Sequence, residues 1–124
     1  MDAASGREPD YVGDEVQIGG GFGGMKPLAQ HGWVVIADGV LTLYGSKGDV
    51  IDQAHLVQVE VKKARVTMGQ SVYVTLNGTR YSVSVGHGAR QLGPIGGGAA
   101  QMGDSRAGTS GFVAAFEALS GKTV

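Results

Sequence analysis

The side chains of this chain that could bind a metal or perform catalysis are few and stand far apart. The three histidines are His31, His55 and His87, and Asp52 and Asp104 are the carboxylates that could complete a site with them. A metal site needs three or four converging ligands, so scattered histidines are more simply interpreted as surface residues. The chain has no cysteine, hence no thiolate ligand and no cysteine nucleophile. We expect no metal site.

Other catalytic arrangements are not indicated either. The sequence contains no nucleophile elbow and no evident pair of carboxylates for acid–base chemistry. Glycine runs at 19–24 and 96–98 invite comparison with phosphate-binding loops, but no Lys-Ser or Lys-Thr follows them and no strand–helix–strand unit surrounds them. They are interpreted as linkers, or as segments that become ordered only on assembly. We therefore expect a non-enzyme without a cofactor.

The only basic cluster is Lys62, Lys63 and Arg65. Lys62 is expected to point outward from a strand, where it could contact an acidic partner or a lipid head group. The simpler interpretation is a solvated strand edge whose charges discourage edge-to-edge pairing. Together with Gln58 and Glu60, these residues form our candidate interaction surface.

Composition limits the kind of partner. The chain has 124 residues, 23 of them glycine, and a formal net charge of −1. A nucleic-acid or anionic membrane ligand would favour a clear basic excess, so we expect neither. No apolar stretch is long enough to span a bilayer, and residues 1–13 contain no apolar run of the kind that marks a secretion signal. The sequence predicts a cytoplasmic protein that binds a protein partner or itself.

Six short strands separated by tight turns are predicted between residues 31 and 85. Asp38-Gly39 and Asn77-Gly78 suit the positive φ angles of two-residue hairpin turns, and we take the former as the turn of the first hairpin. Because every connection is short, consecutive strands are expected to be antiparallel neighbours. The strands are expected at 32–37, 40–44, 49–54, 56–66, 71–76 and 79–85. In the strand at 56–66, Val57, Val59 and Val61 alternate with polar residues and are expected to share one face.

A single helix is predicted near the C-terminus, at 112–119. Phe112, Phe116 and Leu119 fall on one helical stripe. Thr109 or Ser110 could cap the start of the helix and Gly121 its end. So short a helix needs to dock its stripe on the sheet to be stable. The expected core comprises Trp33, Val35, Leu41, Leu43, Val59, Val61, Tyr81, Val83, Phe112, Phe116 and Leu119.

The run from Gly32 to Tyr44, the following strands to Val85 and the final Phe112-Val113-Ala114-Ala115-Phe116-Glu117-Ala118-Leu119 resemble a pleckstrin-homology-like (PH-like) domain. The final segment is similar to the closing helix of small actinobacterial PH-like domains of unknown function. The resemblance implies a mainly β (α+β) fold, a bent antiparallel barrel of six to seven strands capped by one C-terminal helix. A seventh strand would come from 14–18. The lipid site of such domains would place Lys and Arg around the first hairpin turn, and Asp38-Gly39 offers neither.

The expected organisation is a flexible N-terminal arm over 1–30, a PH-like domain over 31–121 with a long glycine-rich insertion at 86–108, and a tail over 122–124. The predicted function is a non-catalytic protein-interaction module, an adaptor or scaffold, that uses an exposed strand edge or the groove between helix and barrel. The alternative is a structural assembly subunit, of a phage particle or a homo-oligomeric complex, whose glycine-rich arms order against neighbours. The third is a barrel that binds a lipid or small ligand.

Overall fold

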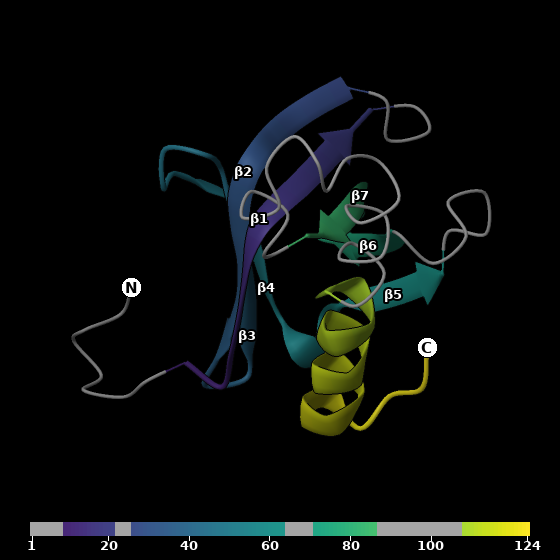
Figure 1. The fold of residues 1–124 in the computed structure, drawn as a ribbon. Helices are drawn as coiled ribbons and strands as arrows, with labels where there is room; N and C mark the ends of the chain where they lie inside the picture. Colours follow the sequence, from purple (N-terminus) through teal and green to yellow (C-terminus); the bar gives the residue numbers. More distant parts are fainter. Residues whose placement is uncertain (1–8, 22–25, 64–70, 87–107) are drawn as a thin grey trace.

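The structure is a computed structural model that describes residues 9–21, 26–63, 71–86 and 108–124. These residues form seven antiparallel strands curled into a half-barrel, with one C-terminal helix against its concave side (Figure 1). The strands are β1 (Tyr11–Gly20), β2 (Lys26–Ala37), β3 (Val40–Tyr44), β4 (Val50–His55), β5 (Glu60–Lys63), β6 (Val72–Leu76) and β7 (Thr79–Val85). The helix includes residues 108–120. The predicted mainly β barrel with a closing helix is confirmed.

The first strand of the chain lies in the middle of the sheet, whose order is β4-β3-β2-β1-β7-β6-β5. β1 pairs with β2 on one side and with β7 on the other. The seventh strand expected at 14–18 is therefore present, and it is longer than predicted. β4 and β5 are consecutive in the chain but lie at opposite edges of the sheet, joined by the 3-10 turn η3 (Leu56–Gln58). The expectation that all consecutive strands pair is wrong for these two.

Side chains bridge the two halves of the sheet near the open side of the half-barrel. The Asp52 carboxylate on β4 accepts hydrogen bonds from the Asn77 amide, at 2.7 Å, and from the Tyr81 hydroxyl, also at 2.7 Å. The Asn77 amide also donates to the backbone carbonyl of Gln53 at 2.9 Å. Since Asn77 and Tyr81 belong to the β6–β7 hairpin, these bonds fasten β4 to the far half of the sheet.

Both hairpin turns predicted from dipeptides are confirmed. Asp38 and Gly39 have φ angles of 52° and 75°, and Asn77 and Gly78 have φ angles of 51° and 81°. Asp38-Gly39 connects β2 to β3, however, because β1 and β2 form the first hairpin. Its assignment as the first hairpin turn is therefore wrong. Residues 22–25, between β1 and β2, lie outside the described part of the chain.

The core lies between the concave face of the sheet and the helix. Phe112 and Phe116 are 0% and 1% exposed, and the Phe112 ring centroid lies 5.8 Å from that of Tyr11 on β1. The Thr109 hydroxyl accepts a hydrogen bond from the Val85 amide at the end of β7. These contacts place the helix on β1 and β7. The buried apolar residues are Val16, Ile18, Ala29, Val34, Ile36, Leu41, Leu43, Ala54, Leu56, Val59, Val61, Val72, Val74, Leu76, Tyr81, Val83, Val85, Phe112 and Phe116.

The helix is longer than predicted, because it already includes residues 108–111. Gly108 passes so close to the backbone that a Cβ at this position would collide with the Val85 carbonyl oxygen. At the other end, Gly121 has φ +76° and its amide donates to the Glu117 carbonyl at 3.0 Å, the left-handed glycine arrangement that terminates helices. The predicted end of the helix is confirmed.

Three residues that were expected in the core are not fully buried. Trp33 is 36% exposed and Val35 is half-buried, because β2 turns Gly32, Val34 and Ile36 toward the core. The run from 33 to 36 is apolar on both faces, so its pattern does not select one of them. Leu119 is 42% exposed, because it lies beyond the part of the helix that the half-barrel covers.

The strand expected at 56–66 begins later than predicted, at Glu60, and residues 64–66 lie outside the described residues. Val57 belongs to η3 and is 76% exposed, while Val59 and Val61 are buried as expected. The turn η3 interrupts the alternation of apolar and polar residues that the sequence shows through Val57.

Several expectations concern the N-terminal segment and the insertion. Residues 26–30, expected in the arm, belong to β2. Gly19 and Gly20, expected in a linker, belong to β1, where they pair with Pro27 and Lys26. The remaining expectations fall on 1–8, most of 86–108, His87, Asp104 and the run at 96–98, which lie outside the described residues.

Candidate functional site

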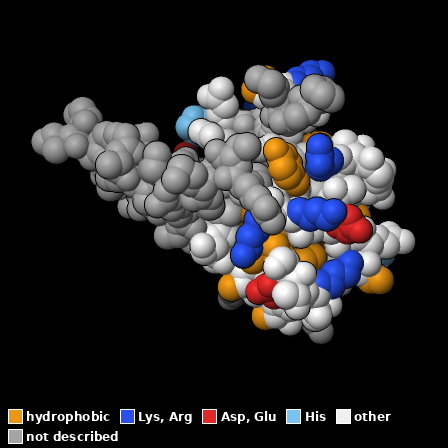
Figure 2. Space-filling view, turned by 90° about the vertical axis from the view of Figure 1, so that its right-hand side faces the viewer, with side chains coloured by type: hydrophobic (Ala, Val, Ile, Leu, Met, Phe, Trp, Pro, Cys, Tyr) orange, Lys and Arg blue, Asp and Glu red, His pale blue; other side chains and the backbone are white. Residues whose placement is uncertain are grey.

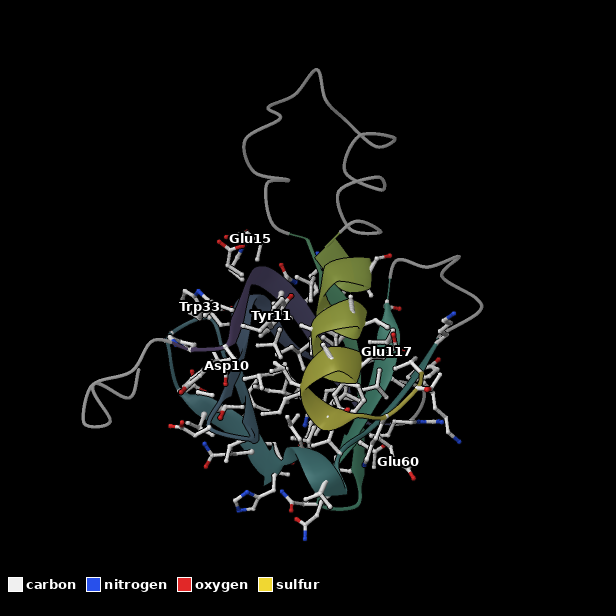
Figure 3. The ribbon with its side chains drawn as sticks, turned by 90° about the horizontal axis from the view of Figure 1, so that it is seen from below. Asp10, Tyr11, Glu15, Trp33, Glu60 and Glu117 are labelled. Carbon is white, nitrogen blue, oxygen red and sulfur yellow. The ribbon has the colours of Figure 1, made fainter. Side chains whose placement is uncertain are left out.

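β5 is an edge strand, and a groove opens beside it. The groove has a volume of about 700 Å³ and lies between β5, the helix and the C-terminal residues of the chain. In Figure 1 the C-terminus ends close to the β5 arrow. Figure 3 shows Glu60 on the sheet edge and Glu117 on the helix toward the same side of the molecule, with Trp33 on the opposite side. The residues of this β5 groove are Glu60, Val61, Lys62, Lys63, Phe116, Lys122, Thr123 and Val124.

The C-terminal residues form the wall of the β5 groove opposite the strand, and three hydrogen bonds and one apolar contact hold them in place. The Lys122 ammonium donates to the carbonyls of Val57 at 2.9 Å and Val59 at 2.8 Å. The amide of Val124 donates to the Glu117 carboxylate at 2.8 Å, and the Val124 side chain packs against the core. Because the turn at Gly121 reverses the chain at the end of the helix, these residues run back toward the sheet.

The backbone direction of β5 follows from these contacts. Val59 is extended, with φ −95° and ψ 136°, and its carbonyl faces the Lys122 ammonium on the groove side. Backbone groups of a strand alternate between its two edges. The N–H and C=O groups of Val61 and Lys63 therefore face the groove, while those of Glu60 and Lys62 face β6. No backbone hydrogen bond occupies the groove-side groups of Val61 and Lys63 among the described residues.

The floor of the β5 groove is apolar and its rim is charged. Val61 and Phe116, 7% and 1% exposed, lie at the bottom, and Val124 is half-buried beside them. Lys62 and Lys63 are exposed on the rim. Figure 2, which faces this side of the molecule, shows Lys and Arg side chains gathered around hydrophobic ones.

The basic surface continues over the outer face of the neighbouring strands. Lys62 is the direct cross-strand partner of Tyr73 on β6. The guanidinium of Arg80 on β7 lies 4.7 Å from the centre of the Tyr73 ring, a cation–π contact. Lys62, Tyr73 and Arg80 therefore form one continuous platform next to the β5 groove.

The candidate interaction surface from the sequence is brought together only in part. Glu60, Lys62 and Lys63 line the β5 groove, whereas Gln58 is exposed in η3 and Arg65 lies outside the described residues. The sequence pattern does not point to Lys122, Thr123 and Val124, which fall in the tail expected over 122–124. The glycine at 121 was the only signal for them, since a left-handed residue after a helix redirects the chain.

In the described part of the chain, no three His, Asp or Glu residues gather closely enough to hold a metal ion. His31 instead contacts the Glu15 carboxylate at 2.8 Å, and His55 is exposed at the end of β4. Among the same residues, no helix combines the length and apolar character needed to cross a membrane.

Two tyrosines outside the β5 groove, Tyr11 and Tyr81, have raised pKa values. Burial, and then the Asp14 charge, raise the pKa of Tyr11 to about 12. Burial, and then the hydrogen bond and charge of Asp52, raise the pKa of Tyr81 to about 12. Both hydroxyls are therefore neutral at ordinary pH, and that of Tyr81 donates a hydrogen bond to the Asp52 carboxylate.

A comparison with models of protein families finds no match to the chain, and a comparison with curated proteins finds none either.

Proposed function

We propose that this chain is a non-catalytic protein-interaction module of PH-like architecture, similar to small bacterial domains of that type, and that it binds an extended segment of a protein partner along β5. The observation that carries the proposal is the groove-side edge of β5. There, the backbone groups of Val61 and Lys63 face an open groove with an apolar floor. An added strand would satisfy these groups by hydrogen bonds, which is the basis of recognition by β-augmentation.

The surroundings of β5 support this mode of binding over simple exposure of an edge. Natural proteins commonly cover an edge strand or place charged side chains on it, and Lys62 and Lys63 on β5 would repel a second copy of this edge. Here Lys122 covers only the carbonyls of Val57 and Val59, just before the strand begins. The edge of β5 itself is open to the groove, and Thr123 and Val124 form the opposite wall of that groove. Side chains of a bound segment that point inward would meet Phe116 and Val124, which supply apolar contacts.

A pair of substitutions at one position tests the role of the backbone. Lys63→Pro removes the amide hydrogen that faces the groove, while Lys63→Ala keeps it, and both remove the same ammonium group. A proline whose nitrogen faces away from the neighbouring strand is tolerated at a sheet edge. The tagged wild-type chain and both variants are purified from the native cells, and the associated proteins are identified by mass spectrometry.

The proposal predicts one stoichiometric partner that the wild-type chain and Lys63→Ala retain and Lys63→Pro loses. Circular dichroism melting curves check that both variants are folded. Retention of the partner by Lys63→Pro would show that binding does not use this edge. Recovery of the chain alone at high mass would point to the assembly function instead.

A further inference from the structure

We infer that the β5 groove selects a segment carrying two adjacent acidic residues next to an apolar one. This inference rests on the proposed function and adds to it the chemical class of the partner. Three features of the described residues support it: the uneven distribution of charge, the lysines without partners on the groove rim, and the spare donor of a tethered ammonium group.

Charge is distributed very unevenly over the surface. Four of the six Lys and Arg residues in the described part of the chain lie at the β5 groove or on the adjoining platform. Of the eight described Asp and Glu residues, only Glu60 and Glu117 lie on this side. The groove side is therefore positive, although the chain as a whole has a formal net charge of −1. A local field of this kind attracts an acidic segment and repels a basic one.

The rim lysines are available for a partner. Lys62 and Lys63 are exposed, and neither forms a salt bridge or a side-chain hydrogen bond with another described residue. On a strand added beside β5, the residues opposite Lys62 and Lys63 would be direct neighbours in sequence, because opposed residues in a ladder are matched one to one. Each would gain from carrying a carboxylate. The next residue would lie opposite buried Val61, where an apolar side chain fits.

The residue opposite Glu60 is not expected to be acidic, because two like charges directly across a strand pair repel each other. An antiparallel segment would therefore read acidic, acidic, apolar, and then neutral or basic. A parallel segment would show the same pattern reversed. The pattern predicts both the composition of the segment and its direction.

Lys122 adds a third cationic group with a fixed position. A lysine ammonium has three donors, and the carbonyls of Val57 and Val59 use two of them. The third remains for an acceptor in the groove. Since those two hydrogen bonds hold the ammonium in place beside the start of β5, it loses little freedom when an acceptor on the segment beyond the acidic pair binds it.

The test is a selection of peptides from a random 12-residue library displayed on phage, with the full chain immobilised. Wild-type protein should enrich peptides with two adjacent acidic residues beside an apolar one. The enriched peptides are then synthesised with a fluorescent label and titrated by fluorescence anisotropy. Lys62→Glu/Lys63→Glu should weaken binding by about tenfold or more, because it replaces two attractions by two repulsions.

The matched control is Lys26→Glu/Lys47→Glu, which makes the same change of net charge on the other half of the sheet, where both lysines are exposed. It should change the affinity by less than about twofold at physiological salt, because these charges lie away from the groove. An equal loss in both double variants would show that only net charge matters and would overturn the inference.

The remaining outcomes separate the inference from the proposed function. Enriched peptides without acidic residues, bound equally by wild type and Lys62→Glu/Lys63→Glu, would overturn the inference and leave the proposed function standing. A library that yields no enriched peptide would count against both. Sedimentation with phosphatidylserine vesicles, lost in Lys62→Glu/Lys63→Glu, in the absence of peptide enrichment would assign the basic surface to lipid and overturn the inference.

Discussion

Two tyrosine hydroxyls link the stability of the fold to alkaline pH. The pKa values of Tyr11 and Tyr81 are raised to about 12 from an ordinary value of 10. The folded state therefore favours the neutral hydroxyl more than the unfolded state does. The resulting stabilisation is fully present below pH 10 and is lost as the pH rises toward 12.

We expect the melting temperature of the wild-type chain to fall steeply between pH 10 and pH 12, and that of Tyr11→Phe/Tyr81→Phe to fall less. Circular dichroism melting curves at pH 9, 10, 11 and 12 measure both. Every other ionisable group is the same in both proteins, so the difference between the two slopes isolates Tyr11 and Tyr81. Equal slopes would contradict the expectation.

At the scale of elements, we expect the C-terminal helix to stabilise the fold through the buried face that carries Phe112 and Phe116. Phe116→Ala should destabilise the fold by about 3–5 kcal/mol, because it removes a large side chain that is almost fully buried. Leu119→Ala, in the same helix, should change the free energy of unfolding by no more than about 0.5 kcal/mol, because Leu119 is 42% exposed.

Urea denaturation followed by circular dichroism measures both changes. Since natural domains have about 5–15 kcal/mol of stability in total, Phe116→Ala should unfold at much lower urea concentration. A large effect of Leu119→Ala would show that the helix continues its buried stripe beyond Phe116. Similar small effects of both substitutions would show that the helix is not needed to close the half-barrel.

The elements predicted best from the sequence are those with a local physical cause. Asp38-Gly39 and Asn77-Gly78 form their turns because Gly and Asn or Asp tolerate positive φ angles. The wrong expectations concern segments whose apolar pattern is compatible with more than one structure. The apolar run at 33–36 fits either face of β2, and the alternation through Val57 is broken by η3.

The β5 groove could be predicted only on its strand side. The alternation of Glu60, Val61 and Lys62 places the two charged residues outward, as found. The opposite wall depends on Lys122, which bonds to carbonyls 65 and 63 residues earlier in the chain. Such contacts depend on where the folded helix directs the last residues, and no spacing rule encodes them.

For the whole molecule, the central position of β1 predicts the order in which parts of the structure open. β1 joins the β2–β3–β4 half to the β7–β6–β5 half, so β1 is released only when its ladders to both β2 and β7 open. Edge strands can open locally at lower free energy. We expect the amides of Val16 and Ile18, both buried in β1, to exchange with solvent only through global unfolding. Those of β5 and β4 should exchange earlier.

Hydrogen exchange followed by NMR at increasing low concentrations of denaturant measures this order. Exchange of the β1 amides should follow the global free energy of unfolding and its full dependence on denaturant. Exchange at the edges should depend on denaturant only weakly. Faster exchange in β1 than in β4 or β5 would contradict the central role of β1.

The contact between the end of β7 and residues 108 and 109 of the helix determines where the chain can accept insertions and deletions. Val85 donates to the Thr109 hydroxyl, the Gly86 amide bonds to the Glu15 carbonyl, and Gly108 lies against the Val85 carbonyl. The chain therefore leaves and re-enters the fold at almost the same point. The free-energy cost of a loop between two adjacent ends grows only with the logarithm of its length. This junction is thus where evolution or a protein engineer could lengthen, shorten or replace sequence, or insert a second domain, while the half-barrel stays as it is.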